Sequence, residues 1–264
     1  MVDRIFDRVF IRPPSKVFPK CVSRNPFRVN VNVDNARRQH KEYVKTLLDY
    51  GVEIIELDTL EGFPDSVFIQ DTAVVGAKSN RALIARFGEN SRRGEEEDVA
   101  QNLLDRGYEI MKIHPPGTLE GGDVMVTDLG IIYVGLSERT NMEGIEQISK
   151  CFQNVSVVYV PLERTFHLLG GVNYLGNKTI IISPNLVDLK YFEEFKMIIV
   201  PKGEEYSSNV LYLGDGNVLI PSGFPKTYEK LKVEGFNPIK VDVSEFWKCD
   251  GGVTCLNLPI YKTV

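Results

Sequence analysis

The sequence of 264 residues lacks the features that mark several common classes of protein. No stretch approaches the ~18 consecutive apolar residues of a membrane-spanning helix. The formal net charge is −5 and the basic residues form no tract longer than a pair such as Arg92 and Arg93, so the field of a general nucleic-acid binder is missing. The amino-terminal run MVDRIFDRVF has acids where a secretory signal has positive charge and then apolar residues. We therefore expect no nucleic-acid or membrane partner, while the sequence leaves a homo-oligomer open.

Cysteine and histidine are also scarce. The cysteines show neither CxxC spacing nor the density of a disulfide scaffold; the four are Cys21, Cys151, Cys249 and Cys255. This pattern favours reduced thiols and a cytoplasmic location. A structural zinc site is disfavoured, because its ligands would have to come from those scattered cysteines and from three histidines, His40, His114 and His167.

What the sequence does contain is a fivefold repeat. In each unit a short helical stretch leads into an apolar strand, a turn, and a second strand that opens on a valine. The spacings between these valines are 57, 48, 38 and 43 residues, for Val67, Val124, Val172, Val210 and Val253. A period in this range is typical of repeated supersecondary units. Because the repeats run through the whole chain, they predict one domain over residues 1–264.

A third strand completes most of the units. The fifth unit ends at Val264 without one, and the run RVFIRP, Arg8–Pro13, stands at the other end of the chain. We therefore predict an α/β fold of five ββαβ-like repeats, a pseudo-fivefold five-bladed α/β-propeller. In that fold the N-terminal strand completes the last unit and closes the ring.

A ring of repeats brings corresponding positions together around its axis. The polar residues beside the valines are Asp65, Asp71, Glu120, His167, Asn209 and Cys255. Arg92 and Arg139 fall at matched positions just after a third strand, which places them on one rim. Because each guanidinium offers a planar fork of donors, such a pair is suited to binding a carboxylate.

Cys255 and His167 admit two interpretations. A thiolate is a strong nucleophile and a histidine can take its proton, which indicates covalent catalysis. A free cysteine on an apolar strand is otherwise a buried structural residue. The acids Asp71 and Glu120 favour catalysis of one kind, because carboxylates alone would raise the thiol pKa, whereas a guanidinium bound between them favours the thiolate. Arginine-like substrates fit this arrangement, and esters or amides do not.

Six motifs carry a resemblance to a known family. They are DSVFIQD, SRRGE, LEGGD, SERTN, FHLL and DGGVTC. They closely resemble those of the dimethylarginine dimethylaminohydrolases, within the guanidine-modifying superfamily of amidinotransferases and arginine deiminases, whose pentein fold is a five-bladed α/β-propeller. The resemblance covers nearly the whole chain and keeps the order of the motifs.

The resemblance implies a role for each candidate residue. Cys255 matches the nucleophile, His167 the general acid and base, and Asp71 and Glu120 the guanidinium ligands. Two groups of residues match those that hold the amino-acid end of the substrate. Arg92 and Arg139 match the pair that binds the carboxylate. Asp65 and the backbone carbonyl of Cys249 match the groups near the α-amino group.

The implied reaction needs no metal or organic cofactor. Cys255 attacks the guanidinium carbon, and an amine protonated by His167 departs. A covalent thiouronium remains, which water activated by His167 converts to a ureido product. An arginine or methylarginine would give citrulline and ammonia or an amine.

Four positions refine this expectation. Gln70 stands where the family usually has a second acid, which bears on the nitrogen substituents that are tolerated. Leu169 stands where arginine deiminases carry an acid, which favours the dimethylarginine type. The stretch RPPSK, Arg12–Lys16, stands where relatives have a mobile lid, and its prolines predict a stiff one. Asn209 has no assigned chemistry, and we expect it to support the pocket by hydrogen bonding.

Three other functions are weighed against hydrolysis. An amidinotransferase would form the same intermediate and pass the amidino group to an amine. A non-catalytic propeller, such as the ribosome anti-association factor, would lack the catalytic residues that this chain has. A papain-like protease has its cysteine early and its histidine late, whereas His167 precedes Cys255.

Overall fold

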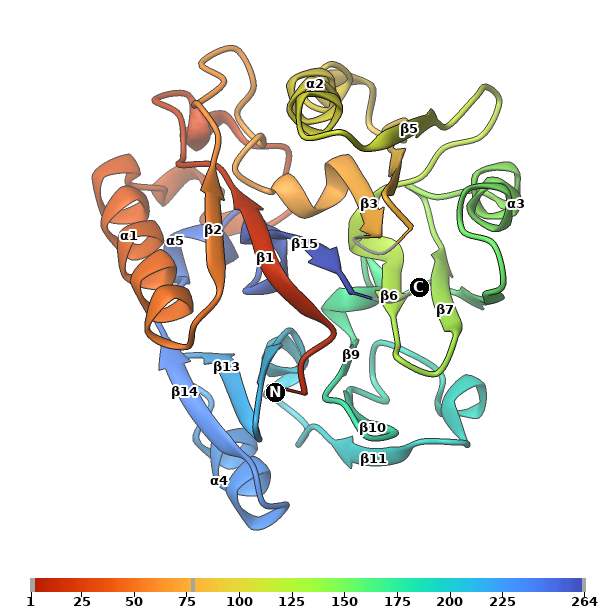
Figure 1. The fold of residues 1–264 in the computed structure, drawn as a ribbon. Coiled ribbons are helices and arrows are strands. Elements are labelled where there is room, and N and C mark those ends of the chain that lie inside the picture. Colours follow the sequence, from red (N-terminus) through yellow and green to blue (C-terminus); the bar gives the residue numbers. More distant parts are fainter. Residues whose placement is uncertain (1–2, 77–78, 263–264) are drawn as a thin grey trace.

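A computed structural model describes residues 3–76 and 79–262 of the chain. It is an α/β structure in which the helices lie around the outside of the sheets (Figure 1). The helices are α1 (Val33–Asp49), α2 (Glu97–Asp105), α3 (Met142–Cys151), α4 (Pro225–Val233) and α5 (Ser244–Trp247). Among these described helices, none has the length and apolar character needed to cross a bilayer.

Five three-stranded units share one topology. In each, an inner strand is antiparallel to the middle strand, which is parallel to the outer strand. In the order inner, middle, outer, the units are β3 (Ala73–Gly76), β4 (Arg81–Ile84), β5 (Glu109–Lys112); β6 (Val124–Val126), β7 (Ile131–Leu136), β8 (Ser156–Pro161); β9 (Val172–Tyr174), β10 (Thr179–Ile182), β11 (Lys196–Ile199); β12 (Leu211–Gly214), β13 (Asn217–Pro221), β14 (Asn237–Val241); and β15 (Leu258–Tyr261), β1 (Phe6–Ile11), β2 (Glu53–Glu56).

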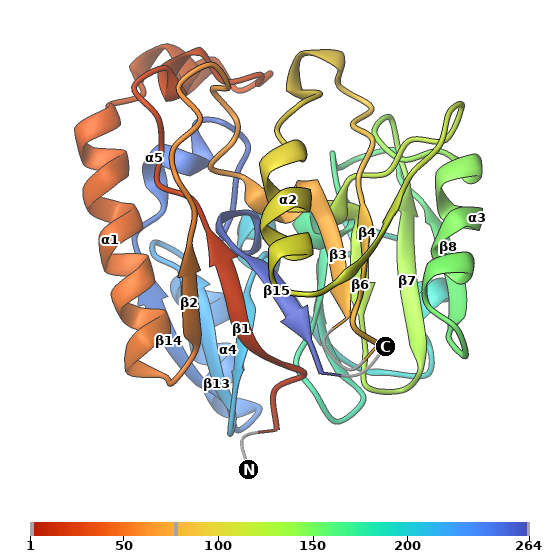
Figure 2. The ribbon, with the colours of Figure 1, turned by 45° about the horizontal axis from the view of Figure 1, so that its top comes forward.

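The first strand of the chain belongs to the last unit. β1 pairs antiparallel with β15, and Val9 lies opposite Pro259. This pairing was expected from the sequence, although the strand covers Phe6–Ile11 instead of Arg8–Pro13. β15 also runs parallel to β3, which joins two units into a six-stranded sheet. The two ends of the chain are thereby held in one sheet (Figure 2).

A short 3-10 turn precedes each inner strand. The turns are η3 (Ile69–Thr72), η5 (Gly121–Asp123), η6 (Leu168–Gly170), η8 (Glu205–Ser208) and η9 (Thr254–Leu256). η3 contacts η5 and η9, and η6 contacts η5 and η8. The turns thus pack on one another between the five inner strands, and this packing places the candidate site.

Two of the five valines are out of the expected register. Val124 and Val172 open β6 and β9, as the repeat predicted. Val67 and Val253 instead come before the turns η3 and η9, because in these two units the residues that follow the valine form the turn and the strand starts later. The polar residues of those units, Asp71 and Cys255, therefore lie in turns and not beside a strand.

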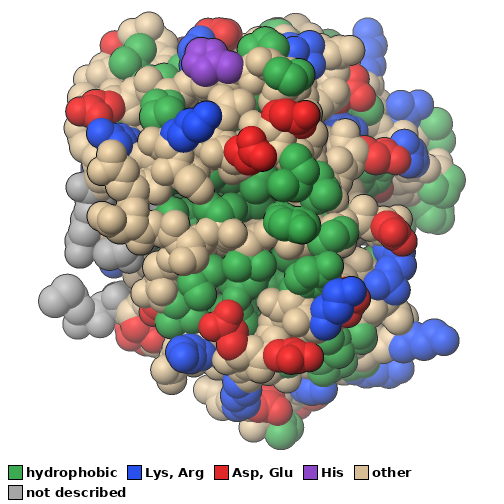
Figure 3. Space-filling model, turned by 90° about the vertical axis from the view of Figure 1, so that its right-hand side faces the viewer, with side chains coloured by type: hydrophobic (Ala, Val, Ile, Leu, Met, Phe, Trp, Pro, Cys, Tyr) green, Lys and Arg blue, Asp and Glu red, His purple; other side chains and the backbone are tan. Residues whose placement is uncertain are grey.

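The surface carries charges of both signs. On the face shown in Figure 3, acidic and basic side chains are interspersed around a central apolar area. On this face, neither sign of charge predominates.

Candidate active site

Four of the predicted residues meet at the packed turns. Asp71 lies in η3 and Cys255 in η9, while Glu120 and His167 directly precede η5 and η6. His167 Nε2 is 2.9 Å from Glu120 Oε2, and His167 Nδ1 is 3.7 Å from Asp71 Oδ1. Cys255, His167 and Asp71 line one cavity of about 50 Å³, which we call the first cavity. Asp71 and Cys255, which are 184 positions apart in the sequence, thus share one site.

Backbone donors and glycines hold the two acids. Gly122 N–H donates to Asp71 Oδ1 at 3.1 Å, and Gly88 N–H donates to Glu120 Oε1 at 3.1 Å. A Cβ on Gly122 would lie 2.6 Å from that Asp71 oxygen and 2.7 Å from His167 Nδ1. Only glycine therefore lets η5 approach both side chains. Glu120 is fully buried and lies behind His167, outside the lining of the first cavity.

His167 and Glu120 form a charged pair. Burial alone would lower the pKa of His167, but the nearby carboxylates, chiefly Asp71 and Asp123, raise it to about 9. Burial would raise the pKa of Glu120, yet the hydrogen bond and charge of His167 lower it to about 2. At neutral pH the imidazolium is therefore a proton donor next to the cysteine.

Cys255 is a protonated thiol in this arrangement. Burial and then the charge of Asp71 raise its pKa to about 12, although Gly252 N–H donates to Sγ at 3.3 Å. A cation bound beside Asp71 would offset that charge and favour the thiolate. The free site therefore does not by itself hold a thiolate, and activation of the nucleophile by a positively charged ligand stays a prediction.

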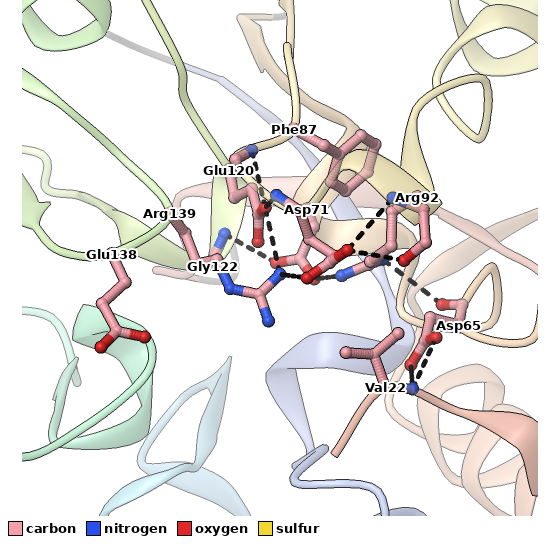
Figure 4. A network of polar contacts seen from close by, with 12 residues as sticks. Val22, Asp65, Asp71, Phe87, Arg92, Glu120, Gly122, Glu138 and Arg139 are labelled. Carbon is pink, nitrogen blue, oxygen red and sulfur yellow. Dashed lines mark hydrogen bonds and ion pairs between the residues drawn. The ribbon is translucent and has the colours of Figure 1, made fainter. Parts of the chain in front are cut away.

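Arg92 is more deeply engaged than the sequence predicted. Its side chain is 5% exposed, with Nη1 2.6 Å from Asp71 Oδ2 and Nη2 2.8 Å from Glu95 Oε2 (Figure 4). Nη2 also donates to the backbone carbonyls of Asp65 and Phe68. Because most of its donors bind protein atoms, Arg92 acts mainly as a fixed positive charge between acids.

Arg139 is the more open arginine. Its Nη1 lies 3.6 Å from Glu120 Oε1, and its guanidinium carbon lies 5.7 Å from the centre of the Phe166 ring. Its side chain is 15% exposed and lines the first cavity. Within the described residues, the Arg139 guanidinium makes no hydrogen bond that meets normal geometry, and its ion pairs with Glu120 and Glu89 are long, at 3.6 and 4.0 Å.

The cysteines are not all reduced, contrary to the sequence-based expectation. Cys21 and Cys249 form a disulfide, with Cα atoms 6.0 Å apart. Their 228-residue separation hid this pair, because only the closure of the fold brings the two ends of the chain together. Cys151 and Cys255 are free. Cys249 still lines the first cavity, as predicted.

The disulfide fixes the segment that borders the first cavity. Val22, next to Cys21, lines that cavity and its N–H donates to both carboxylate oxygens of Asp65, at 3.0 and 3.2 Å. Ser23 Oγ donates to Asp250 Oδ2 at 2.6 Å, on the loop that leads to the nucleophile. We call residues 21–25 the strap.

The stretch Arg12–Lys16, expected to be a stiff lid, does not line the first cavity. Arg12 is fully buried and ion-pairs with Asp98 Oδ2 at 2.5 Å. It is therefore part of the protein interior. The strap takes the position over the site that the sequence assigned to this stretch.

Gln70 and Asn209 do not border the first cavity. Gln70 Nε2 donates to the carbonyl of Gly121, and its side chain lines a separate cavity on the other side of the turns. Asn209 binds the backbone N–H and the hydroxyl of Thr254, at 2.9 and 3.0 Å. Asn209 therefore supports the turn that carries Cys255, as expected, and Gln70 is not placed to contact a ligand there.

Sequence reasoning missed two supporting acids. Asp123 Oδ1 accepts from Leu168 N–H at 3.0 Å and so anchors the turn that follows His167. Burial raises the pKa of Asp123 to about 6. Glu95 binds the guanidinium of Arg92 from three residues further along the chain. The motifs LEGGD and SRRGE contain both acids, so their motif membership was the available signal.

The same acids and histidine could hold a metal ion. Asp71, Glu120 and His167 each offer one ligand atom, and these atoms lie within 4.8 Å of one another. Two carboxylates are equally suited to the N–H donors of a guanidinium. Turnover measured in the presence of a chelator distinguishes a metal ion from a guanidinium at these residues.

Comparison with known proteins gives the family. The family model of eukaryotic N,N dimethylarginine dimethylhydrolase matches residues 22–262. An uncharacterized protein of Aeropyrum pernix is 44% identical over 99% of this chain and 98% of its own length. The dimethylarginine dimethylaminohydrolase of Pseudomonas aeruginosa is 37% identical over 84% of this chain and 87% of that protein.

Solved structures agree with these sequence matches. A cysteine-to-serine variant of the Pseudomonas aeruginosa enzyme, in complex with citrulline, has a TM-score of 0.89 at 32% identity and covers 97% of this chain and 100% of that one. The N-terminal domain of the cyanobacterial arginine dihydrolase ArgZ has a TM-score of 0.86 at 21% identity, covering 97% and 98%, and shares the fold. This chain belongs to the dimethylarginine dimethylaminohydrolase family of hydrolases.

Proposed function

We propose that the protein hydrolyses a C–N bond at the guanidinium carbon of arginine or Nω-methylated arginine, with Cys255 as the nucleophile. The observation that carries this proposal is the meeting of one nucleophile, one imidazolium and one buried acid, Cys255, His167 and Asp71, at a single small cavity. Citrulline in the related Pseudomonas aeruginosa structure supports the ureido product.

Substrate charge is the trigger of the reaction. The guanidinium pairs with Asp71, which offsets the negative charge that helps to keep the Cys255 thiol protonated. Glu120 acts from behind by holding His167. The thiol gives its proton to solvent water as Sγ bonds to the guanidinium carbon, which yields a neutral tetrahedral adduct. An ester or amide brings no such charge, so the thiol would stay protonated.

His167 then serves both halves of the reaction. Its imidazolium gives a proton to the departing nitrogen, the C–N bond breaks, and a thiouronium remains on Sγ. The neutral imidazole accepts a proton from water as the oxygen adds to the same carbon. The hydroxyl proton of the adduct passes to Sγ as the C–S bond breaks and the ureido product leaves, so the thiol and the imidazolium are restored.

The amino-acid end of the substrate lies against the strap. Arg139 has free donors for the α-carboxylate, with Arg92 adding a fixed charge behind Asp71. Asp65 and the carbonyl of Cys249 offer acceptors for the α-ammonium group. Asp65 already accepts from Val22, so the strap and the substrate would share one acid.

The fold proposed for this chemistry is a single domain, a five-bladed α/β-propeller over residues 1–264. Five units of identical strand order and the pairing of β1 with β15 support it. In such a ring the five turns would surround one axis, with the first cavity at one end.

The test is turnover of a panel of guanidines. Arginine, monomethylarginine, asymmetric dimethylarginine and agmatine are incubated with the protein, and ureido product and released amine are measured. We expect citrulline from at least one of the first three and none with Cys255→Ser. EDTA should leave the rate unchanged, because the substrate supplies the positive charge. Unchanged turnover by Cys255→Ser would exclude the mechanism.

Amidino transfer is the second candidate, because a larger cavity on the other side of Cys255 has room for an acceptor amine. The two functions differ in product. If adding glycine or another amine diverts most of the intermediate from citrulline to a new guanidine, the protein is a transferase.

A further inference from the structure

A second cavity of about 300 Å³ meets the first at the reacting groups. His167 and Cys255 line both cavities, so the nucleophile and the proton donor lie at the boundary between them. Asp65, Asp71 and the two arginines line only the first cavity. The groups suited to the amino-acid end of a substrate are therefore all on one side of Cys255.

Aromatic side chains make up part of the wall of the second cavity. Tyr206 and Trp247 line this cavity alone, and Phe166 lines both cavities. Tyr206 is fixed, because its hydroxyl donates to the carbonyl of Gly251 at 2.7 Å, and Trp247 stacks on Phe27 at 5.4 Å between ring centres. Aromatic faces bind both apolar groups and ammonium ions.

Two acids and one base add charge to this wall. Asp250 and Glu205 line the cavity, and Arg164 lies at it as well. Asp250 Oδ2 accepts from Ser23 and from Arg24 N–H, so its charge is held in place by the strap. Acids beside aromatic rings suit an amine that becomes positively charged when it is released.

The direction of the substrate follows from its chemistry, given the function proposed above. The residues that the proposed function assigns to the α-amino and carboxylate groups, Asp65, Cys249 and Arg139, line only the first cavity. The nitrogen that departs must lie near His167, which protonates it. Any substituent on that nitrogen then points past His167 and Cys255, into the second cavity.

We propose that the second cavity is a subsite for the departing nitrogen and that it accepts substituents much larger than methyl, with an apolar or aromatic group preferred. Its volume equals that of roughly ten waters in the liquid, more than two methyl groups fill. The bond that breaks is the C–N bond of the substituted nitrogen. The proton comes from His167, and the amine leaves through the aromatic wall.

The test compares arginines that carry methyl, propyl and benzyl groups on one terminal nitrogen. For the wild type we expect kcat/KM for Nω-benzylarginine within tenfold of that for Nω-methylarginine. Leu186 also lines the cavity, and Leu186→Trp should fill it and lower the benzyl-to-methyl ratio of kcat/KM at least tenfold. Leu104→Trp on α2, where Leu104 is exposed, is the matched control and should keep the ratio.

A wild-type measurement guards against misfolding of the variant. Benzylamine should inhibit turnover at least tenfold more strongly than methylamine, because the released amine occupies the same subsite. Equal inhibition by both amines, or a loss of more than a hundredfold from methyl to propyl, overturns the subsite while turnover of Nω-methylarginine leaves the proposed function intact. Turnover of no guanidine at all overturns both.

Discussion

Arg92 Nη1 lies 2.6 Å from Asp71 Oδ2, so the acid proposed to bind the substrate guanidinium already carries one internal guanidinium. The other Asp71 oxygen accepts from Gly122 N–H and lies 3.7 Å from His167 Nδ1. Asp71 is therefore oriented before any ligand binds. Such preorganisation reduces the cost of fixing the acid when substrate arrives.

The two arginines should respond differently to substitution. Arg139→Ala is expected to raise KM for arginine tenfold or more and to change agmatine turnover little, because agmatine has no carboxylate. Arg92→Ala leaves Asp71 and Glu95 buried without their countercharge, which costs about 3–5 kcal/mol of stability. Urea unfolding and kinetics with both substrates measure these effects.

Equal loss of arginine and agmatine turnover in Arg139→Ala would contradict the role of Arg139 in carboxylate binding. Arg24 offers a matched control. It is an exposed arginine that pairs with Glu138 Oε2 at 3.0 Å, and Arg24→Ala should leave the free energy of unfolding within about 0.5 kcal/mol of the wild type.

The His167 ion pair predicts a pH dependence of stability. The pKa of His167 is raised from 6.5 to about 9 in the folded protein. Protonation therefore stabilises the fold fully below pH ~6.5, and this contribution is lost as the pH rises through about 9. It is on the order of 3 kcal/mol. Urea unfolding at a series of pH values from 6 to 10 should show the decline.

His167→Gln should flatten that profile. The variant cannot gain or lose the proton, so its free energy of unfolding should change less between pH 6.5 and 9 than that of the wild type. His40 is a matched control, because burial lowers its pKa to about 4, and its titration falls outside this range. A decline that persists undiminished in His167→Gln would assign the effect to another group.

The outcome for the sequence-based site follows from what a repeat can encode. The repeat indicated Asp71, Glu120, His167 and Cys255 because each lies in, or directly before, the turn that precedes an inner strand. Gln70 was placed near the substrate by the family resemblance, and it lines another cavity because adjacent residues of a 3-10 turn point in different directions. A strand period could not reveal this.

Long-range closure explains the remaining errors. The pair Cys21 and Cys249 depends on two chain ends meeting, and no local pattern records such a contact. A residue of the strap, Val22, lines the first cavity, whereas the sequence assigned a lid to Arg12–Lys16. The supporting acids Asp123 and Glu95, in contrast, are part of the family motifs. Their hydrogen bonds distinguish them from surface acids.

The disulfide should tie substrate affinity to the strap. Cys21→Ser frees residues 21–25 from Cys249, so we expect a higher KM for arginine with a smaller change in kcat, and a loss of about 2–5 kcal/mol in stability. Thiol counting in denaturant should give two free thiols for the wild type, Cys151 and Cys255. Cys151→Ser is the control and should not alter KM. Four free thiols in the wild type would contradict the disulfide.

Asn209 predicts a separate effect on the nucleophile. Its amide oxygen accepts from Thr254 N–H and its amide nitrogen donates to the Thr254 hydroxyl and the Leu169 carbonyl. Asn209→Ala leaves these buried groups unpaired, so the turn carrying Cys255 should loosen. We expect kcat to fall tenfold or more, while the KM for arginine changes less because the first cavity does not include Asn209.

Asn173 provides the comparison for this prediction. It also donates to the Leu169 carbonyl, at 2.7 Å, and makes no hydrogen bond to Thr254. Asn173→Ala should therefore destabilise the fold and lower kcat less than Asn209→Ala. The alkylation rate of Cys255, followed by peptide mass spectrometry, gives a second readout, because a loosened turn exposes the thiol. Full activity together with an unchanged alkylation rate in Asn209→Ala would show that Asn209 does not support the turn that carries Cys255.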